Sequence, residues 1–504
     1  LNKTSFFIDG SFLTNTSTTE NNSFFRAKAK AEQNFNKKWL GAFINFETNS
    51  RKSGTTQDFI NTSHRFKEIE AYFGVGDSTK VFTKIGFNYR NNDSIKLNTF
   101  TEINNRKTFY LNSKLIQNKK TNLNIFANYR LTENRFTNNE KSLNSRIIFN
   151  QKLFKNFINL GTVYETSSGN IARQEYIYVK TEPGLGYYTW IDYNSDGVQD
   201  FDEFEIAQFQ DQAEYLRLPK PNLQFIATQR AKFTQSINLN PRVWSSKKGF
   251  KKILSHFYNQ SFLSVENEQE KIGSSFNFNP FDFDESKLIG LSFNLRNSIY
   301  FNKNLQKHSV SYTFGKNQNK QQYLIGSQEN NIKLHQIDYA HKFASFWLFE
   351  LMGKTSNNNL ETENFNNRNY TIKANEIQPK ISFLYNKSNR FTAFYHFKDK
   401  ENQLPDFEQL NQQKFGFEYF YISSKKNQIS ANINVFLNDF TGDSNTPVAY
   451  QMLEGLQSGQ NYTWSILFNQ ELNPFLNLNL NYLGRKSENS RNIHTGSIQL
   501  RAIF

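Results

Sequence analysis

The chain has 504 residues, a formal net charge of +15 and no cysteine, so disulfide bonds and thiolate metal sites are excluded. Hydrophobic residues make up only 37% and the mean hydropathy is -0.71, which is low for a protein with a large dry core. Aromatic residues nevertheless reach 16%, with 52 Phe and 24 Tyr, and this excludes ordinary disorder. The composition suits a sheet with one apolar face and one wet face.

Charge and hydropathy limit the possible binding partners and the possible location of the chain. Nucleic acid, anionic lipid headgroups and lipopolysaccharide phosphates could all attract this positive charge, but the basic residues are scattered, which argues against nucleic acid. No run approaches 18 apolar residues, so we expect no transmembrane helix. Strands of a membrane barrel are only half apolar, so a membrane location stays open. Because the chain begins at Leu1 without a leader sequence, we expect a processed or partial chain.

Apolar and polar residues alternate with a period of two in long runs. Four clear runs are residues 81–90, 122–131, 429–438 and 475–484. In the last run, Leu478 and Leu480 alternate with Asn477, Asn479 and Asn481. Each run has about 10–12 residues, enough to cross a bilayer at a tilt, whereas strands of soluble proteins usually stop at five or six. The alternation therefore predicts membrane-spanning β-strands.

Connections between these runs alternate in length. Short polar turns are predicted around Asn36–Lys38, Lys119–Thr121, Asn240–Trp244, Asn302–Asn304, Asn386–Asn389, Ser424–Asn427 and Asn473–Pro474. Long loops are predicted at residues 49–63, 266–285, 356–376 and 440–460. Short turns on one side and long loops on the other are typical of outer-membrane barrels. The fold class we predict is all-β, a transmembrane antiparallel β-barrel of about 22 strands (range about 18–26), with residues 1–504 forming one barrel.

The longest loop, residues 169–222, contains the sequence "DYNSDGVQDFDE" at positions 192–203. This stretch resembles the twelve-residue calcium loop of EF-hands and the related loops of dockerins. The resemblance implies that the metal ligands are Asp192, Asn194, Asp196, the carbonyl of Val198, Asp200 and Glu203, with Gly197 at the sharp turn. Alternate oxygens of such a loop converge on one Ca²⁺ ion, and the last Glu can close the shell with both of its oxygens.

Two observations qualify the calcium prediction. Gln199 stands where paired EF-hands place an apolar residue, and no second copy of the loop occurs, so we expect a lone structural site rather than a sensor pair. The upstream sequence is not helical, whereas residues 203–216 could form a short helix. The alternative is an acidic turn that solvates itself, although six carboxylates between Asp192 and Glu205 would repel one another without a cation.

The end of the chain reads "TGSIQLRAIF", an amphipathic strand that stops on Phe504. It resembles the C-terminal aromatic signature by which bacterial outer-membrane barrels are recognised for assembly. The Asn-, Lys- and Phe-rich, loop-rich style is similar to that of large barrels of Bacteroidota-type bacteria. The resemblance implies a bacterial outer-membrane location, and with Phe504 at the periplasmic rim the loop of residues 169–222 is extracellular.

Other residues give weaker signals. The seven histidines are His64, His256, His308, His335, His341, His396 and His494; they form no HxH or HExxH motif, and no GxSxG occurs, so we expect no enzyme. By alternation, six basic residues point inward: Lys84, Arg90, Arg130, Arg296, Arg485 and Arg501. They could make the lumen prefer anions, but pairing with inward acids is the simpler expectation.

Three functions remain in order of preference. The first is a transport or translocation channel with a calcium-ordered external loop. The second is a structural or assembly subunit that binds other outer-membrane or periplasmic proteins through its loops, and the third is a surface hydrolase. A barrel of about 22 strands encloses a lumen wide enough to need a plug, so we expect an upstream segment, a partner or inward-folded loops to fill it. Outer-membrane lipid and lipopolysaccharide are the expected surroundings.

Overall fold

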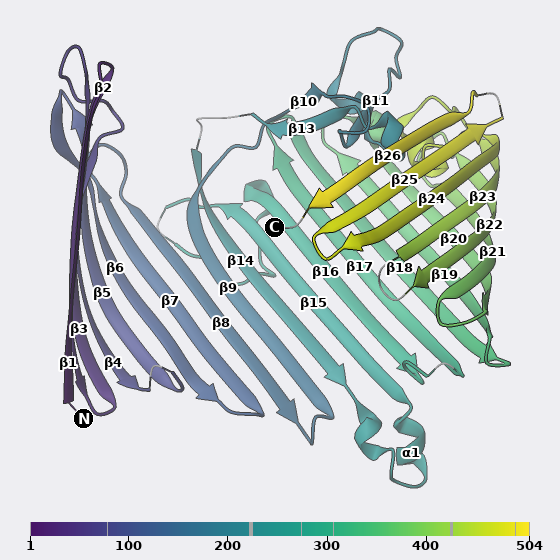
Figure 1. The fold of residues 1–504 in the computed structure, drawn as a ribbon, viewed down its shortest axis with the longest axis horizontal. Helices are drawn as coiled ribbons and strands as arrows, with labels where there is room; N and C mark the ends of the chain where they lie inside the picture. The colour runs from purple at the N-terminus through teal and green to yellow at the C-terminus, as the bar shows by residue number, and fades with distance from the viewer. Residues whose placement is uncertain are drawn as a thin grey trace. The chain divides into compact units, whose positions relative to one another are not determined.

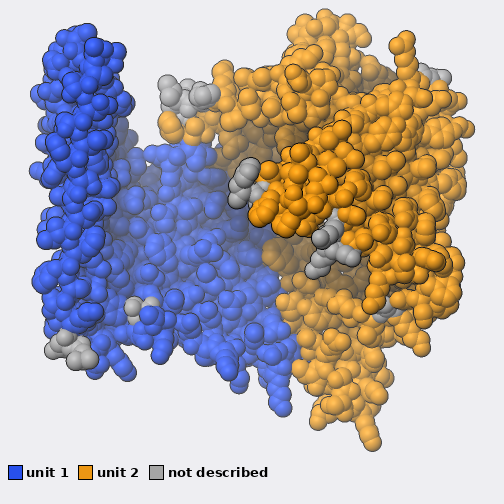
Figure 2. Space-filling model, in the orientation of Figure 1, with its two compact units in different colours: residues 1–171, 226–237, 264–288 blue, residues 172–225, 238–263, 289–504 orange. Residues whose placement is uncertain are grey.

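The computed structural model describes residues 2–77, 79–220, 225–273, 275–305, 307–423, 427–488 and 490–502. Phe504, most of the turn predicted at Ser424–Asn427 and the last two residues of the loop predicted at 169–222 lie outside these ranges. The chain forms two compact units (Figure 2). Unit 1 comprises residues 1–171, 226–237 and 264–288, and unit 2 comprises residues 172–225, 238–263 and 289–504.

Twenty-two long strands form an antiparallel sheet (Figure 1), which confirms the predicted all-β fold class of about 22 strands. Unit 1 contains nine complete or nearly complete strands, most of β14 (Phe225–Leu239) and part of β15 (Phe257–Glu270). The nine are β1 (Asn2–Thr16), β2 (Glu20–Phe35), β3 (Lys38–Ser53), β4 (His64–Gly76), β5 (Phe82–Lys96), β6 (Thr99–Gln117), β7 (Thr121–Asn134), β8 (Glu140–Leu153) and β9 (Ile158–Ala172).

Unit 2 contains the remainder of β15 and the eleven long strands that follow. They are β16 (Leu288–Phe301), β17 (His308–Tyr323), β18 (Gly326–Phe343), β19 (Trp347–Thr362), β20 (Tyr370–Leu384), β21 (Asn389–Asn402), β22 (Gln409–Ser423), β23 (Asn427–Thr441), β24 (Gly459–Asn473), β25 (Leu476–Ser487) and β26 (Ile493–Ala502). It also has α1 (Phe250–Leu254) and α2 (Pro447–Leu453). Among the described residues, neither of these helices is long or apolar enough to cross a membrane.

One face of the sheet is apolar and bare. In unit 1, Phe73 of β4 lies opposite Ile85 of β5, and Phe87 of β5 lies opposite Phe109 of β6. All four side chains are exposed, and the exposed fraction of Ile85 is 53%. In unit 2 the alternating leucines of β25 lie beside exposed Ile498 and the other apolar residues of β26. The alternation seen in the sequence thus places apolar side chains on one surface of adjacent strands.

The opposite face is polar and internally paired. In unit 1 the Lys30 ammonium lies 3.1 Å from the Glu32 carboxylate, and the Tyr72 hydroxyl donates to Glu32 at 2.7 Å. Two of the predicted inward basic residues also pair with acids: Lys84 with Glu70 at 3.6 Å, and Arg90 with Glu68 at 3.8 Å. For these residues, the expectation that inward cations pair with inward acids is confirmed.

Close packing of rings across strands requires glycine at some positions. The ring of Tyr110 on β6 lies directly over Gly86 on β5, so a Cβ atom there would overlap the ring. The Tyr110 hydroxyl in turn forms a hydrogen bond with Glu70 of β4 at 2.5 Å. A tyrosine can therefore cross one strand and reach an acid on the next because the strand between them carries no side chain.

The connections depart from the predicted lengths in two ways. The strands run further than expected, so the predicted loop of residues 356–376 shrinks to residues 363–369, which include the 3₁₀-helix η5 (Asn366–Arg368). The short turn predicted at Asn240–Trp244 is wrong. These residues form the 3₁₀-helix η3 (Pro241–Trp244), and the connection continues through α1 to residue 256.

Candidate functional site

Residues 173–220, which we call the insertion, form a small four-stranded sheet on unit 2. Its strands are β10 (Tyr176–Lys180), β11 (Tyr188–Trp190), β12 (Phe204–Ile206) and β13 (Tyr215–Pro219), in the order β10-β13-β11-β12. Its core is aromatic: the Tyr178 and Phe204 rings stack at 3.9 Å, and Phe204 meets Tyr215 edge-on at 5.1 Å. The short helix predicted for residues 203–216 is wrong, because this core holds Phe204 and Tyr215 on strands.

The predicted calcium loop joins β11 to β12, and its first half is built by its own backbone. One carboxylate oxygen of Asp192 accepts a hydrogen bond from the Gly197 amide at 2.9 Å, while its other oxygen, Oδ1, is buried without a partner. Gly197 has a positive φ of 72°. Asn194 Oδ1 accepts from the Asp196 amide at 2.9 Å, and Asp196 Oδ1 accepts from the Val198 amide at 2.7 Å. A positive φ favours glycine, as expected for Gly197 at the sharp turn of the loop.

The second half of the loop is held differently. Glu203 is buried, and its carboxylate accepts from the Trp190 indole at 2.7 Å and from the Tyr193 amide at 3.2 Å. Burial, followed by repulsion from Asp196 and other nearby acids, raises the pKa of Asp200. Within the described ranges no three Asp, Glu, His or Cys side chains are gathered closely enough to hold a metal. The donor types of the loop suit a cation, and one Asp192 oxygen has no partner, whereas the Glu203 carboxylate is directed to Trp190 and Tyr193.

Arg368 of η5 fastens the insertion to the neighbouring loops. Its guanidinium lies 3.0 Å from the carboxylate of Glu205, which is only 1% exposed, and it donates to the carbonyls of Asp202 and Phe204. Burial raises the pKa of Glu205 to about 7, although the charge of Arg368 and a hydrogen bond from Gln451 act in the opposite direction. Glu205 is therefore a buried carboxyl that titrates near neutral pH.

Helix α2 lies between the insertion and the strands. Its Val448, Met452 and Leu453 are buried against a cluster from β19, β20 and β22 that includes Ile372 and Leu410. At the insertion, the Tyr450 hydroxyl donates to the carbonyl of Ile206, and the amide of Gln208 donates to Tyr450. A helix of seven residues thus links the insertion to the polar face of the sheet.

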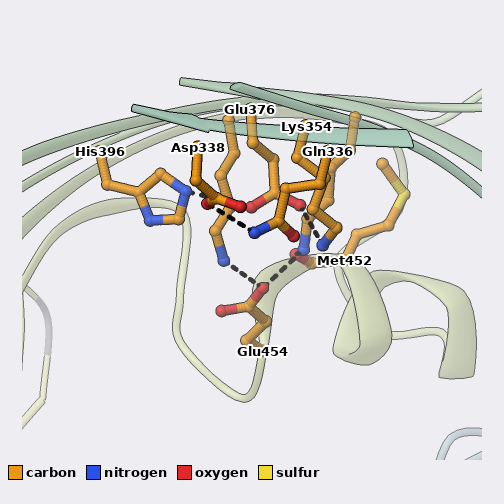
Figure 3. Close-up of polar contacts among 9 residues, drawn as sticks. Gln336, Asp338, Lys354, Glu376, His396, Met452 and Glu454 are labelled. Atoms are coloured by element: carbon orange, nitrogen blue, oxygen red, sulfur yellow. Dashed lines mark hydrogen bonds and ion pairs between the residues drawn. The ribbon is translucent and has the colours of Figure 1, made fainter. Parts of the chain in front are cut away.

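A network of charges connects the loop after α2 to the strands (Figure 3). Glu454, just after α2, accepts from the ammonium groups of Lys398 at 2.7 Å and Lys400 at 2.9 Å, both on β21. Burial would raise the pKa of Glu454, but these two lysines lower it to about 2. Next to them, Glu376 of β20 bridges Lys354 at 2.8 Å and His396 at 3.1 Å. Figure 3 shows these strand side chains pointing toward the loop that carries Glu454.

A cavity of about 510 Å³ lies between the insertion and strands β22–β26. Its wall on the strands includes Lys414, Asn432, Asn434 and Thr463, and its roof includes residues 208–211 and Glu454. Arg485 of β25, predicted to point inward, pairs with Asp211 of the insertion at 2.5 Å. The insertion and α2 therefore cover part of the polar face of unit 2.

The histidines lie in separate contacts. His64 faces Glu47, His256 faces Asn302, His335 faces Tyr312, His396 faces Glu376 and His494 faces Tyr482, while His308 is opposite His341 in register. Arg368 and Glu454, which hold the loops together, were not predicted from the sequence. Their partners are 163 and 54 residues away along the chain, and no local pattern marks them.

No protein family matches the chain, and no curated protein matches it. Its structure is similar to that of the ferric-catecholate import receptor Fiu of E. coli K12, with 8% identity over 94% of this chain and 76% of that one, at a TM-score of 0.34. It is also similar to the FrpB iron transporter of Neisseria meningitidis, with 8% identity over 96% of this chain and 80% of that one, at a TM-score of 0.38. For the ferric enterobactin receptor PfeA of Pseudomonas aeruginosa, the identity is 7% over 96% of this chain and 74% of that one, at a TM-score of 0.36.

Proposed function

We propose that the chain is the barrel of a bacterial outer-membrane transport or translocation channel, of Bacteroidota type, whose external loops fold onto its polar face. The observation that carries this proposal is the difference between the two faces of the sheet. The apolar face is bare on adjacent strands, whereas the polar face of unit 2 is covered by the insertion, α2 and η5. A soluble protein would bury the apolar face and expose the polar one.

Hydrocarbon is the surrounding that suits the bare face. Monomeric soluble proteins rarely expose contiguous apolar patches larger than a few hundred Å², and here neighbouring strands β4, β5 and β6 all expose Ile or Phe on the same face. In a bilayer every backbone N–H and C=O must be paired within the protein, a requirement that antiparallel strands meet when their sheet closes into a barrel. Lipid and lipopolysaccharide of the outer membrane are the proposed neighbours, and nucleic acid is not.

Transport is supported by the cavity under the insertion. Its lining combines amides, hydroxyls, the cation of Lys414 and the Arg485–Asp211 pair with apolar side chains such as Phe436 and Trp464, so a solute with polar and apolar parts could be held there. Ion pairs and hydrogen bonds at Arg368, Tyr450 and Glu454 hold the insertion and α2 against the polar face. Movement of the insertion and α2 would break these contacts and open the polar face.

Calcium is proposed to order the insertion. Asp192, Asn194, Asp196, the Val198 carbonyl, Asp200 and Glu203 supply the oxygens that Ca²⁺ prefers. The buried, unpartnered Asp192 oxygen supports the proposal, as do the acids Asp196, Asp202 and Glu203, whose charges act after burial to raise the pKa of Asp200. Extracellular calcium modules bind with Kd of about 10⁻⁴–10⁻³ M, so even a weak site would be filled outside the cell.

Conductance of the full chain in planar bilayers tests the channel. We expect low conductance in millimolar calcium and higher conductance after EGTA, because the insertion is then less ordered. Asp192→Ala should show the EGTA behaviour in calcium, whereas Glu285→Ala, an exposed acid of another long loop, should match the wild type. A chain that remains monodisperse in buffer without detergent would refute the membrane proposal, and conductance absent in calcium and EGTA alike would refute the channel.

A second candidate function is a subunit that docks other envelope proteins through the insertion. The insertion exposes apolar side chains to solvent, among them Tyr187 at 72%, Leu185 and Ile206. Tyr187→Ser/Ile206→Ser should abolish recovery of a stoichiometric partner from native membranes without changing conductance. Recovery of no partner by the wild type would exclude this candidate.

A further inference from the structure

The strand ends opposite the insertion in unit 2 carry an unusual segment, residues 240–256, which joins β14 to β15. It contains Arg242, Lys247, Lys248, Lys251 and Lys252 and no acidic residue. The neighbouring connection, from β16 to β17, adds Lys303 and Lys307, and the two connections touch through a hydrogen bond from the Asn302 amide to the His256 carbonyl at 2.8 Å. We call residues 240–256, residues 302–305 and Lys307 together the basic rim.

The basic rim surrounds a cavity of about 420 Å³. Arg242, Lys252 and Lys303 line it together with the hydroxyl-bearing Ser245 and Ser255. In the part of the chain that the structure describes, none of the three cations lies within 4.0 Å of a carboxylate. The Lys303 ammonium lies 3.9 Å from the centre of the Tyr258 ring, which orients it without neutralising it. Three unneutralised cations around one cavity attract an anion.

Apolar side chains stand next to these cations. On α1, Phe250 is 71% exposed and Ile253 is 57% exposed, and exposed Phe257 follows at the start of β15. Lys251 and Lys252 lie between the two apolar residues in sequence and are exposed as well. Basic residues mixed with exposed Phe and Ile are typical of segments that lie in the headgroup region of a membrane. A free anion would make no use of Phe250 and Ile253.

We propose that the basic rim binds the phosphate of an anionic phospholipid headgroup, with Arg242, Lys252 and Lys303 around the phosphate and with Phe250 and Ile253 among the acyl chains. The proposal rests on the proposed membrane location of the sheet. It adds a site for a specific lipid class at the end of the strands remote from the insertion. Anionic headgroups would thus anchor this end of β14–β17 at the bilayer surface.

The test uses the full chain in neutral detergent micelles and counts bound lipids by native mass spectrometry. The probes are phosphatidylglycerol and phosphatidylcholine of equal acyl length, with glycerol phosphate as a soluble competitor. We expect phosphatidylglycerol to bind about tenfold more tightly than phosphatidylcholine, and the variant Arg242→Gln/Lys252→Gln/Lys303→Gln to lose this preference. The control Arg135→Gln/Arg173→Gln/Arg491→Gln removes the same charge from exposed residues at the other strand ends and should keep the preference.

The outcomes separate the lipid site from the membrane proposal. Requirement for detergent, measured by monodispersity, tests the membrane location, whereas headgroup preference tests the basic rim. The variant Phe250→Ser/Ile253→Ser should weaken both lipids equally and keep the preference for phosphatidylglycerol. Equal binding of the two lipids by the wild type would overturn the proposal, and so would competition by glycerol phosphate at the same concentration as the lipid. Circular dichroism of each variant establishes that a loss is not a failure to fold.

Discussion

The Glu205–Arg368 pair makes the docking of the insertion depend on pH. Burial raises the pKa of Glu205 from 4.5 to about 7, against the opposing charge of Arg368. Below pH 4.5 the carboxyl is protonated in the docked and undocked states alike. Between pH 4.5 and 7 the undocked carboxyl ionises while the docked one keeps its proton, so docking weakens as pH rises. The pKa shift of Glu205 corresponds to a loss of about 3 kcal/mol in the free energy of docking, and this loss is complete above pH 7.

Two substitutions separate the charge from the contact. Glu205→Gln keeps the shape of the side chain and should remove the pH dependence of docking between pH 5 and 8. At pH 8, where Glu205 is ionised, Arg368→Met leaves its carboxylate without a cation, and breaking a buried pair in this way costs about 3–5 kcal/mol. The double substitution should cost less than Arg368→Met alone, since no buried charge is then left unpaired.

Hydrogen exchange of the insertion amides measures docking directly. Protection of the Gln208 amide, which donates to the Tyr450 hydroxyl of α2, should be greater at pH 5 than at pH 8 after correction for the intrinsic exchange rate. The comparison is made at constant calcium, with Glu205→Gln as the reference for all other titrating groups. Equal pH dependence in the wild type and Glu205→Gln would refute the reasoning, as would unchanged protection in Arg368→Met.

Three further predictions address the sheet and α2. Ile85→Arg on the apolar face should cost about 2–4 kcal/mol in lipid, measured by unfolding in bilayers, whereas Asn128→Arg on the polar face should cost much less; equal costs would argue against a lipid contact. Gly86→Ala should lower the unfolding midpoint because its Cβ meets the ring of Tyr110, and Gly86→Ala with Tyr110→Leu should recover part of the loss. Glu454→Gln should loosen α2 by about 1–2 kcal/mol at pH 7, since the carboxylate is 40% exposed and solvent screens it; unchanged exchange of α2 amides would contradict this.

The strands could be predicted because alternation is a local property. In β25 the leucines and asparagines identify two faces from sequence alone, and the exposed Leu500 beside Leu478 confirms which residues share the apolar face. Strand ends were predicted less well. β19 and β20 continue for several residues past the apolar run through Asn, Thr and Glu, because antiparallel hydrogen bonds extend wherever both strands remain paired, whatever their side chains.

The insertion shows where local reasoning fails. Residues 203–216 are rich in Glu, Gln and Ala, which favour helix, yet they contain β12 and β13. The aromatic contacts of Phe204 with Tyr178 and Tyr215 decide the outcome, and tertiary packing of this kind overrides weak propensities. Likewise, Arg368 reaches Glu205 only because the fold brings η5 against β12. Neither the aromatic packing of Phe204 nor the Arg368–Glu205 pair produces a periodic pattern in the sequence.

Charge is scattered along the sequence but sorted in the fold. In unit 2 the connections at one end of the strands carry the basic residues Arg242, Lys247, Lys248, Lys251, Lys252, Lys303, Lys307 and Lys387 and no acid among the described residues. The connections at the other end include the insertion, with its calcium loop and Glu205, and the loops that carry Asp406, Asp443 and Glu454. Antiparallel strands send successive connections to opposite ends, so an alternation of basic and acidic loops looks random in sequence. A barrel placed across a bilayer would use the basic end for lipid phosphates and the acidic end for cations, which are the two ligands proposed here.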